Sequence, residues 1–484
     1  MERLSGLDAA FTYLETPSLH MHVSMAAVFD PTTVPGGYSY DKVRDLVSER
    51  LARAPIFRRR LVQVPFRLDH PYWVEDPNFD IDYHMRRAAL PAPGGIEELA
   101  EFVGDVCSRQ LDRSKPLWEM YLVEGLADGR IGVVTKIHHC TIDGVSGAEL
   151  LAELFDLEAN PASKPVPEEL PGLTSGLPSD LVLLGRAMVA RATRPARLTR
   201  LAWKTGKAFF DVRRVRQSTP AGHAALPLTT PRTSLNQAIT AHRRVAFSTI
   251  SLDDVKRVKN ALETTVNDVV LAICTGALRQ YLIDGDELPD DPLVATVPVS
   301  VQGAQMKSAN KVSAMFVALP CRVDDPVKRL LTIRDSTKGA KEEHKALGAE
   351  VLLDWAEHAT PNLFSAAARA YTRFRLAEHH RPIHSLVISN VPGPDFPIYL
   401  GGSQLVAGFP LGPVMDGAGL NITVMSYRGT LNWGLMACRE TVPGVDRLAG
   451  YVPAALEELL SSAGLDPATP VGVAPGPDRR APVG

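Results

Sequence analysis

Residues 135–147 read Thr-Lys-Ile-His-His-Cys-Thr-Ile-Asp-Gly-Val-Ser-Gly, and this stretch changes character twice. The overlapping run 131–137 is apolar and rich in β-branched residues, which predicts a buried or half-buried strand. Two adjacent histidines, His138 and His139, end the run. The Asp-Gly pair that follows indicates a turn, because glycine adopts backbone angles that other residues avoid, and an amphipathic helical pattern comes next. The sequence therefore predicts a strand, a tight turn and a helix, with both histidines at the end of the strand.

The two histidines are expected to point in different directions. Successive side chains of a strand lie on opposite faces, so only one imidazole can face a given cavity, and the other must hold the turn or pack elsewhere. For the same reason Cys140, one residue beyond His139, is expected to be a packed interior thiol and not a nucleophile. We expect no metal site, since adjacent strand residues diverge and no second cluster supplies the remaining ligands.

The order His-His-x-x-x-Asp-Gly, filled by His138, His139, Asp143 and Gly144, resembles the active-site motif of the acyl-CoA-dependent acyltransferase superfamily. Other blocks resemble one member family, the bacterial wax ester synthase/diacylglycerol acyltransferases, and follow the order found there. These blocks are Leu7-Asp8-Ala9-Ala10-Phe11 with Met21-His22-Val23, Pro116-Leu117-Trp118-Glu119, Pro231-Arg232-Thr233, Val266-Asn267-Asp268-Val269-Val270-Leu271-Ala272 and Ser389-Asn390-Val391-Pro392-Gly393-Pro394. Together they are far more specific than the histidine pair alone.

The resemblance implies an α/β, two-domain, condensation-domain-like acyltransferase fold, with mixed sheets flanked by helices and pseudo-symmetric halves. A length of 484 residues also exceeds what one hydrophobic core usually serves. We expect an N-terminal acyltransferase domain over 1–156, a Pro-rich linker with a basic amphipathic segment over 157–225, a C-terminal acyltransferase domain over 226–466 and a disordered tail over 467–484. Five prolines between 157 and 180 indicate the linker.

The resemblance also implies a reaction. A fatty acyl group would pass from acyl-CoA to the hydroxyl of diacylglycerol and give triacylglycerol, with His139 as general base in an interdomain tunnel. His138 and Asp143 would be structural, with Arg232 as a partner for Asp143 on residue type alone. Gly144 would serve the turn and let substrate approach. No bound cofactor is expected, and acyl-CoA is a co-substrate.

Three alternatives remain open. They are wax ester synthesis with a long-chain alcohol acceptor, a condensation-type reaction on carrier-protein thioesters, and a non-catalytic protein that binds a lipid surface.

Acyl transfer from a thioester needs a base and oxyanion donors but no covalent acyl-enzyme, since a thiolate leaves readily. Histidine suits the base because its ordinary pKa is about 6.5. Ser146 lacks the Gly-x-Ser-x-Gly spacing of a nucleophile elbow.

Five further residues in the blocks are candidates for substrate contact. Pro116, Leu117 and Trp118 either pack under the active-site strand or line the acyl channel. Asn267 and Asp268 stand at a predicted helix N-terminus, where such residues are ordinary caps, while the resemblance implies that they shape the second domain's side of the site.

A sixth candidate, Asn390, precedes a Pro-Gly-Pro loop and would donate to the oxyanion or simply belong to a rigid turn.

Composition excludes other classes of function. A formal net charge of −3 gives no overall attraction to nucleic acid, and no Walker loop or Gly-x-Gly-x-x-Gly motif follows a strand. Five scattered cysteines without a Cys-x-x-Cys motif indicate reduced thiols in a cytoplasmic protein.

Any contact with a membrane is expected to be peripheral. No uninterrupted apolar run approaches the roughly 18 to 20 residues that span a bilayer, and the N-terminus is too polar for a secretory signal. The segment 181–216 holds ten Lys or Arg against one acid, with several aromatics. Such a segment either lies on an anionic lipid surface, at the inner membrane or a lipid droplet, or covers an acidic face of the protein itself.

Overall fold

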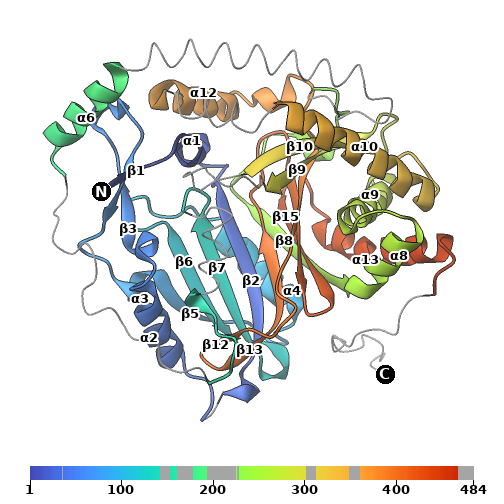
Figure 1. Ribbon diagram of the computed structural model, residues 1–484, viewed down its shortest axis with the longest axis horizontal. Helices are drawn as coiled ribbons and strands as arrows, with labels where there is room; N and C mark the ends of the chain where they lie inside the picture. Colours follow the sequence, from blue (N-terminus) through green and yellow to red (C-terminus); the bar gives the residue numbers. More distant parts are fainter. Residues whose placement is uncertain are drawn as a thin grey trace.

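Two six-stranded sheets lie side by side in the centre of the molecule, with helices around them (Figure 1). The computed structural model describes residues 1–34, 36–141, 153–160, 178–192, 225, 228–300, 312–347 and 360–466. The first sheet has the order β12-β13-β2-β7-β6-β5, from β2 (His22–Asp30), β5 (Met85–Ala89), β6 (Trp118–Glu124), β7 (Ile131–His138), β12 (Tyr399–Leu400) and β13 (Ser403–Leu411). The second has the order β10-β9-β11-β14-β15-β8, from β8 (Arg243–Ser251), β9 (Leu293–Ser300), β10 (Val312–Leu319), β11 (Leu386–Val391), β14 (Leu420–Tyr427) and β15 (Thr430–Cys438).

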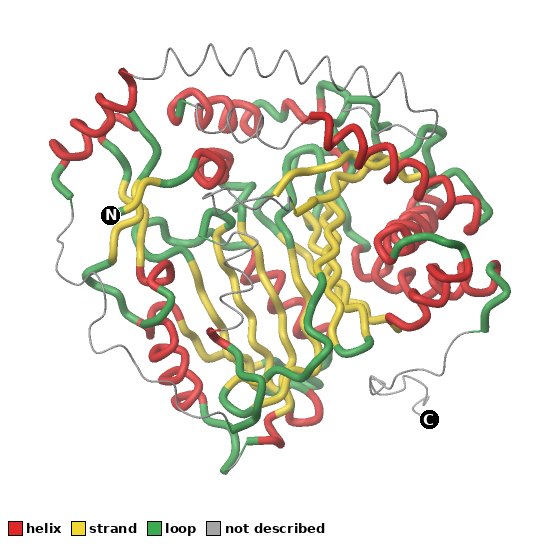
Figure 2. The backbone as a smooth tube through the Cα atoms, viewed as in Figure 1, coloured by secondary structure: helices red, strands yellow, loops and turns green. Residues whose placement is uncertain are grey.

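Both sheets are mixed, as expected for this fold class. In the first, β5 runs parallel to β6 and the other neighbours are antiparallel. In the second, β11 runs parallel to both β9 and β14. Figure 2 shows the two sets of strands meeting near the middle of the molecule, with helices on the outer sides.

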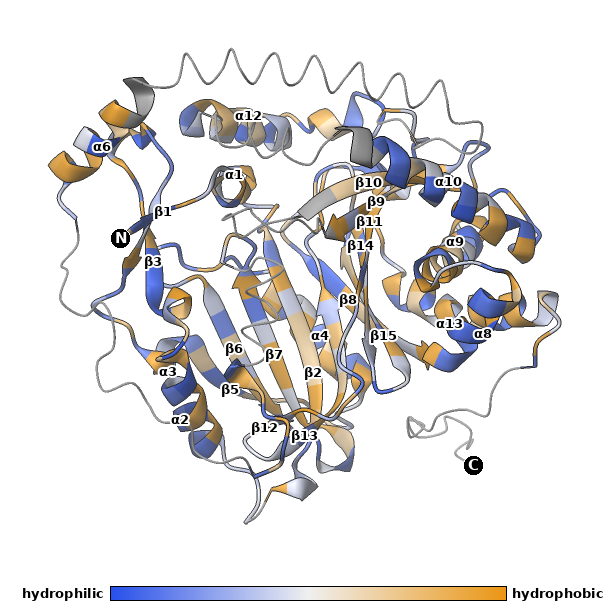
Figure 3. Ribbon diagram, viewed as in Figure 1, coloured by the Kyte–Doolittle hydropathy of each residue, from blue (hydrophilic) through white to orange (hydrophobic). Residues whose placement is uncertain are grey.

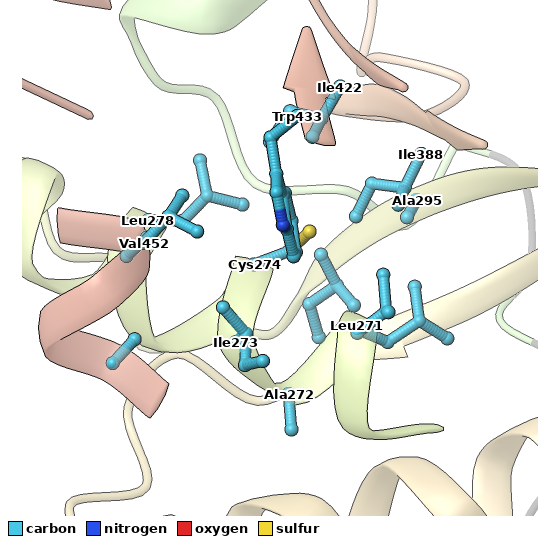
Figure 4. Close-up of a cluster of buried hydrophobic side chains, with 14 of the residues drawn as sticks. Leu271, Ala272, Ile273, Cys274, Leu278, Ala295, Ile388, Ile422, Trp433 and Val452 are labelled. Carbon is cyan, nitrogen blue, oxygen red and sulfur yellow. The ribbon is translucent and has the colours of Figure 1, made fainter. Parts of the chain in front are cut away.

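The helices that cover the sheets do so through apolar faces. They are α2 (Tyr40–Leu51) and α3 (Ile81–His84) on the first sheet, and α8 (Leu252–Ala261), α9 (Val266–Asp284), α10 (Pro326–Leu347) and α13 (Val445–Ser462) with the second. Helix α4 (Ile96–Cys107) packs on β2 and β7 of the first sheet and on β8 of the second. Leu99 and Val103 of α4 are buried beside Val134 of β7. Figure 4 shows the core of the second half, where Trp433, Leu271 and Cys274 belong to one buried cluster.

Helix α9 is long and apolar enough to cross a bilayer by length and composition alone, but most of it is buried inside this core. Its buried residues include every position from Asp268 to Leu278. We therefore interpret α9 as a core helix, because the protein's own side chains already cover its apolar surface.

The remaining elements lie toward one edge of the molecule. They are β1 (Glu2–Arg3), β3 (Arg59–Val62) and β4 (Tyr72–Glu75), which form a small sheet, and the helices α1 (Gly6–Leu14), α6 (Asp180–Ala192) and α12 (Pro361–Arg373). Short 3-10 turns are η1 (Pro31–Thr33), η2 (Pro55–Arg58), η3 (Pro65–Arg67), η4 (Ala127–Gly129), η5 (Ser234–Asn236) and η6 (Leu376–Glu378). Helix α12 packs across α1 (Figure 1), so a segment from the C-terminal half covers the N-terminal helix.

Strand β13 joins the two halves in a way that the sequence does not predict. It comes from residues 403–411, yet it pairs antiparallel with β2 in the first sheet and also packs against β14 and β15 of the second. Its approach to β15 is so close that a Cβ at Gly434 would lie 2.0 Å from the carbonyl oxygen of Pro410. The halves are thus tied by backbone pairing, and the domain limits at 156 and 226 stay predictions.

The strongest local patterns give the elements that the sequence predicts. The strand predicted over 131–137 is present as β7, and the helix predicted to begin at Asn267 and Asp268 is present as α9. Residues 147–152 of the predicted helix 147–155 lie outside the described residues. So do most of the linker, most of the basic segment 181–216 and the tail after 467.

Replacing Gly434 by alanine should destabilise the protein by about 1–3 kcal/mol, since the new methyl group would overlap a backbone carbonyl that cannot rotate away. Urea unfolding followed by circular dichroism measures the change. Gly450→Ala in α13 is the matched control, because a Cβ there meets nothing within 4 Å and alanine favours helix. Equal unfolding midpoints for Gly434→Ala and the unmodified protein would contradict the close approach of β13.

Candidate active site

The end of β7 is held by backbone hydrogen bonds to both neighbouring strands. The amide of His138 donates to the carbonyl of Leu117 (3.0 Å), and the amide of His139 donates to the carbonyl of Met21 (2.9 Å). The amide of Thr141 then donates back to the carbonyl of His138 (2.9 Å), which turns the chain away from the sheet. Because β7 lies between β2 and β6, this turn is fixed on both sides.

The two imidazoles have separate surroundings, as predicted. His138 is buried, and its ring lies edge-on to that of His22, with ring centroids 6.0 Å apart. His139 is only half-buried, and its ring lies against Phe11 of α1, with centroids 4.1 Å apart. Only His139 therefore keeps solvent-accessible surface, and α1 covers part of it.

His138 closes the turn through its ring. Its Nδ1 accepts the backbone amide of Cys140 (3.1 Å) and lies 3.0 Å from the Sγ of that residue. A ring whose Nδ1 accepts carries its proton on Nε2, and Nε2 faces the buried carboxylate of Glu15 at 3.6 Å. Arg113 holds the same carboxylate oxygen at 2.8 Å. His138 thus holds the turn through Nδ1, and its Nε2 lies toward Glu15, just beyond α1, at a distance too long for a hydrogen bond.

The surroundings of His139 favour its neutral form. Burial lowers the pKa of its imidazole from about 6.5 to about 4, because the charged form would lose its hydration, and the nearby His138 ring acts in the same direction. The ring is therefore unprotonated at neutral pH. Its Nδ1 is buried and has no hydrogen-bond partner among the residues that the structure describes. A neutral imidazole can take a proton from a hydroxyl group through whichever ring nitrogen carries a lone pair that the hydroxyl can reach.

Cys140 is a packed interior thiol, which confirms the expectation from the sequence. The side chain is buried in a cluster with Leu4, Ala9 and Leu117, and burial raises the pKa of its thiol. A neutral, enclosed thiol is a poor nucleophile.

The ranges that the structure describes contain no group of three His, Cys, Asp or Glu side chains arranged to hold a metal ion.

Asp143 and Gly144 lie outside the described residues, so their roles stay predictions. Arg232, the partner proposed for Asp143, donates to the backbone carbonyls of Ala377 (3.1 Å) and His380 (2.6 Å). Both hydrogen bonds come from the same terminal nitrogen of the guanidinium, and both acceptors belong to the C-terminal half of the chain.

Pro116, Leu117 and Trp118 are all buried. The indole of Trp118 donates to the carbonyl of Phe57 (2.8 Å) and stacks on His84, with centroids 4.5 Å apart. Leu117 contributes its carbonyl to the amide of His138. These contacts favour packing beneath the strand over direct substrate contact.

Asp268 has a capping role. Its carboxylate accepts the amide of Thr265 (2.9 Å) in a capping box at the start of α9, and its other oxygen accepts the hydroxyl of Thr337 on α10 (2.7 Å). The neighbouring Asn267 is half-buried on the same turn. The ordinary cap is thus the reading that geometry favours for Asp268, whereas Asn267 stays available for another task.

Asn390 is half-buried near the end of β11, and the Pro-Gly-Pro loop follows it. The loop is held tightly, since the amide of Gly393 donates to the hydroxyl of Ser426 (3.0 Å). A Cβ at Gly393 would lie 2.1 Å from the carbonyl oxygen of Ser426, so the loop requires glycine there. The rigid turn that the sequence predicts is present, and the role of Asn390 as an oxyanion donor stays a proposal.

Sequence reasoning did not assign roles to Phe11 and Glu15, although both contact the histidine pair. Phe11 belongs to a block that carried the resemblance, so its position was available as a signal. Glu15 belongs to no motif and stands 123 positions before His138, which no local pattern connects. Met21 was quoted as part of a block, but its contribution is a backbone carbonyl that any residue would supply.

Comparison with known proteins identifies relatives over the whole chain. Family models match the wax ester synthase/diacylglycerol acyltransferase catalytic domain over residues 4–270 and the corresponding C-terminal domain over residues 308–460. A Mycobacterium tuberculosis H37Rv protein with the provisional name diacylglycerol O-acyltransferase is 40% identical over 462 residues, which cover 95% of this chain and 90% of that one. A Mycobacterium bovis protein with the same provisional name is 34% identical over 471 residues, 96% of this chain and 100% of that one.

Solved structures agree. The wax ester synthase/diacylglycerol acyltransferase from Marinobacter aquaeolei VT8 has a TM-score of 0.66 and 32% identity, covering 96% of this chain and 100% of that one. The first condensation domain of the calcium-dependent antibiotic synthetase has a TM-score of 0.54 at 14% identity, covering 97% of each chain, and shows a shared fold alone. The resemblance and the condensation-domain-like fold expected from the sequence are thereby confirmed.

The lowered pKa of His139 predicts an acid-sensitive fold. In the unfolded chain the imidazole titrates near 6.5 and in the folded protein near 4, so within that window the unfolded chain binds the proton. Stability should therefore fall as pH falls from 6.5 toward 4. Burial lowers the pKa in the same direction for His20, His22, His84 and His384. Melting temperatures between pH 7.5 and 4.5 test the slope, and NMR titration of the His139 ring should give a midpoint well below 6.5. A midpoint at 6.5 would show a hydrated ring.

Proposed function

The chain belongs to the wax ester synthase/diacylglycerol acyltransferase family, and on that premise we propose that it moves a fatty acyl group from acyl-CoA to the free hydroxyl of diacylglycerol. The product would be triacylglycerol. The observation that carries the proposal is the neutral, half-buried imidazole of His139 at the fixed end of β7. The names of the mycobacterial relatives support diacylglycerol as the acceptor.

His139 would act as general base. It takes the hydroxyl proton while the alcohol oxygen attacks the thioester carbonyl, and the tetrahedral intermediate then expels the thiolate of CoA. The imidazolium returns the proton to that thiolate, so the ring ends neutral and no net proton is exchanged. Because burial holds the pKa of this ring low, the imidazolium is a strong acid and gives up its proton readily.

The residues around His139 would support this step without taking part in it. His138 and Glu15 hold the turn, and Asp143 and Gly144 would complete it on the far side. Of the candidates for substrate contact, we keep Asn267 and Asn390, whose half-buried side chains are available. Pro116, Leu117, Trp118 and Asp268 would act indirectly, through packing and capping.

The proposal also concerns where the site lies in the protein and where the protein lies in the cell. We propose that the site lies between the two halves, in a tunnel that donor and acceptor enter from different sides. We also propose a cytoplasmic protein that contacts the inner membrane or a lipid droplet, because acceptor and product are both insoluble in water. Wax ester synthesis with a fatty alcohol is the second candidate, since the family's own description names both reactions.

A competition assay decides between the two acceptors. Purified protein receives labelled palmitoyl-CoA with equal amounts of diacylglycerol and hexadecanol, and chromatography separates the products. We expect triacylglycerol to exceed wax ester, with release of free CoA in proportion. Excess wax ester would favour the second candidate, and release of CoA at the background rate with every acceptor would reject the enzymatic assignment. Turnover only with carrier-bound thioesters would indicate the condensation type.

Replacing His139 by alanine should lower kcat by about 10²- to 10⁴-fold, the usual contribution of a general base, and leave the melting temperature nearly unchanged. His242→Ala is the matched control, because that histidine is exposed at the surface and should leave kcat unaffected. A His139→Ala protein that keeps full turnover, or cells whose lipid content is unchanged by it, would instead support a non-catalytic lipid-binding role.

A further inference from the structure

Helix α12 turns its apolar side to the solvent. Leu363 is 71% exposed, and Phe374, at the end of the helix, is 63% exposed. The side that packs inward is mixed, since Ser365 is buried, the hydroxyl of Thr372 donates to Asp416 (2.6 Å), and the ring of Phe364 lies toward Tyr13 of α1. A surface helix normally buries its large apolar residues, so the exposure of Leu363 and Phe374 is unusual.

The exposed stripe is continuous along α12. Leu363, Ala367, Ala370 and Phe374 recur every three or four residues, which places them on one side of the helix. Arginines border the stripe at Arg369 and Arg373, and the sequence from 361 to 374 contains no acid. The guanidinium of Arg373 lies 5.9 Å from the ring of Phe374.

Helix α6 also exposes apolar residues, although its buried side is apolar as well. Leu183 and Ala187 are buried against Val64 and Tyr72, while the other side of the helix exposes Leu181, Met188 and Val189. Figure 3 colours several residues of α6 as hydrophobic and shows α6 and α12 along the same edge of the molecule.

Phe66 connects the two helices. It lies in the turn η3 with a left-handed backbone (φ 55°), and its ring is 79% exposed. Its carbonyl accepts the side-chain amide of Asn362 at the start of α12 (2.9 Å), and α6 packs against the same turn. We call Phe66, the exposed residues of α6 (Leu181, Met188, Val189) and those of α12 (Leu363, Phe374) the apolar edge.

We propose that the apolar edge is a docking face that inserts into the surface of an anionic phospholipid bilayer. Contiguous exposed apolar residues mark an interaction surface. Large apolar side chains bordered by arginines fit the boundary between acyl chains and anionic headgroups, where the rings are buried and the guanidinium groups meet phosphate. The face overlaps the basic segment predicted over 181–216 only in α6, and it adds Phe66 and α12, which come from other parts of the chain.

The position of the apolar edge links it to the proposed function, although the inference stands without it. The inner side of α12 packs on α1, where Phe364 lies 6.2 Å from Tyr13, centroid to centroid. Phe11 of the same helix lies against His139. One helix therefore separates the docking face from the proposed base, which suits an acceptor that resides in the bilayer.

Flotation with vesicles tests the proposal in the full-length protein. The variant carries Leu363→Glu and Phe374→Glu, and vesicles contain phosphatidylcholine with about 30% phosphatidylglycerol. We expect the unmodified protein to float and the variant to lose roughly tenfold in its vesicle-bound fraction, with the melting temperature unchanged. Ile283→Glu on α9 and Ile96→Glu on α4 are matched controls, since both residues are exposed and apolar but lie outside the apolar edge.

Other occupants of the face give different results. If another segment of this chain covers the stripe, the double variant melts at a lower temperature while flotation is unchanged. If a second copy covers it, sedimentation shows loss of a dimer with flotation unchanged. Either result overturns the proposal. Should the double variant not fold, Phe66→Glu alone must reduce flotation, and full flotation of that variant would overturn the proposal as well. Flotation requires no turnover, so its failure is distinguishable from failure of the proposed acyl transfer.

Discussion

The site depends on the pinning of the end of β7 between two other strands. The carbonyls of Leu117 and Met21 accept the amides of His138 and His139 from opposite sides, so the chain must turn where the two histidines stand. The pinning sends one ring to Glu15 and the other to Phe11. One imidazole holds the turn and burial favours the neutral form of its neighbour, although their chemistry is identical, because the sheet gives them different environments.

Patterns of neighbouring residues predict those elements whose structure depends mainly on neighbouring residues. The apolar, β-branched run identifies β7, and the ordered blocks identify the family and the histidine pair. The capping box of Asp268 was one of two readings open at the sequence level, and the contacts with Thr265 and with Thr337 on another helix favour it. Asp143 and Gly144, though central to the motif, lie outside the described residues.

The features that the sequence did not predict depend on distant segments. The pairing of β13 with β2 joins residues more than 370 positions apart, and no periodicity specifies a partner strand. Helix α12 was missed because its sequence is rich in alanine and its few large apolar residues point away from the core, against the usual rule. Glu15 was missed because a buried carboxylate that orients a histidine has no motif of its own.

Strand β13 also constrains the order of events during synthesis on the ribosome. The N-terminal sheet ends at β2 until residues 403–411 have been translated, so nearly the entire chain must emerge before that sheet acquires its last partners. In the interval β2 presents a row of unpaired amides and carbonyls, which is a template for aggregation with other nascent chains. A polypeptide that stops short of residue 403 would carry this open edge permanently, even with all of its catalytic motif in place.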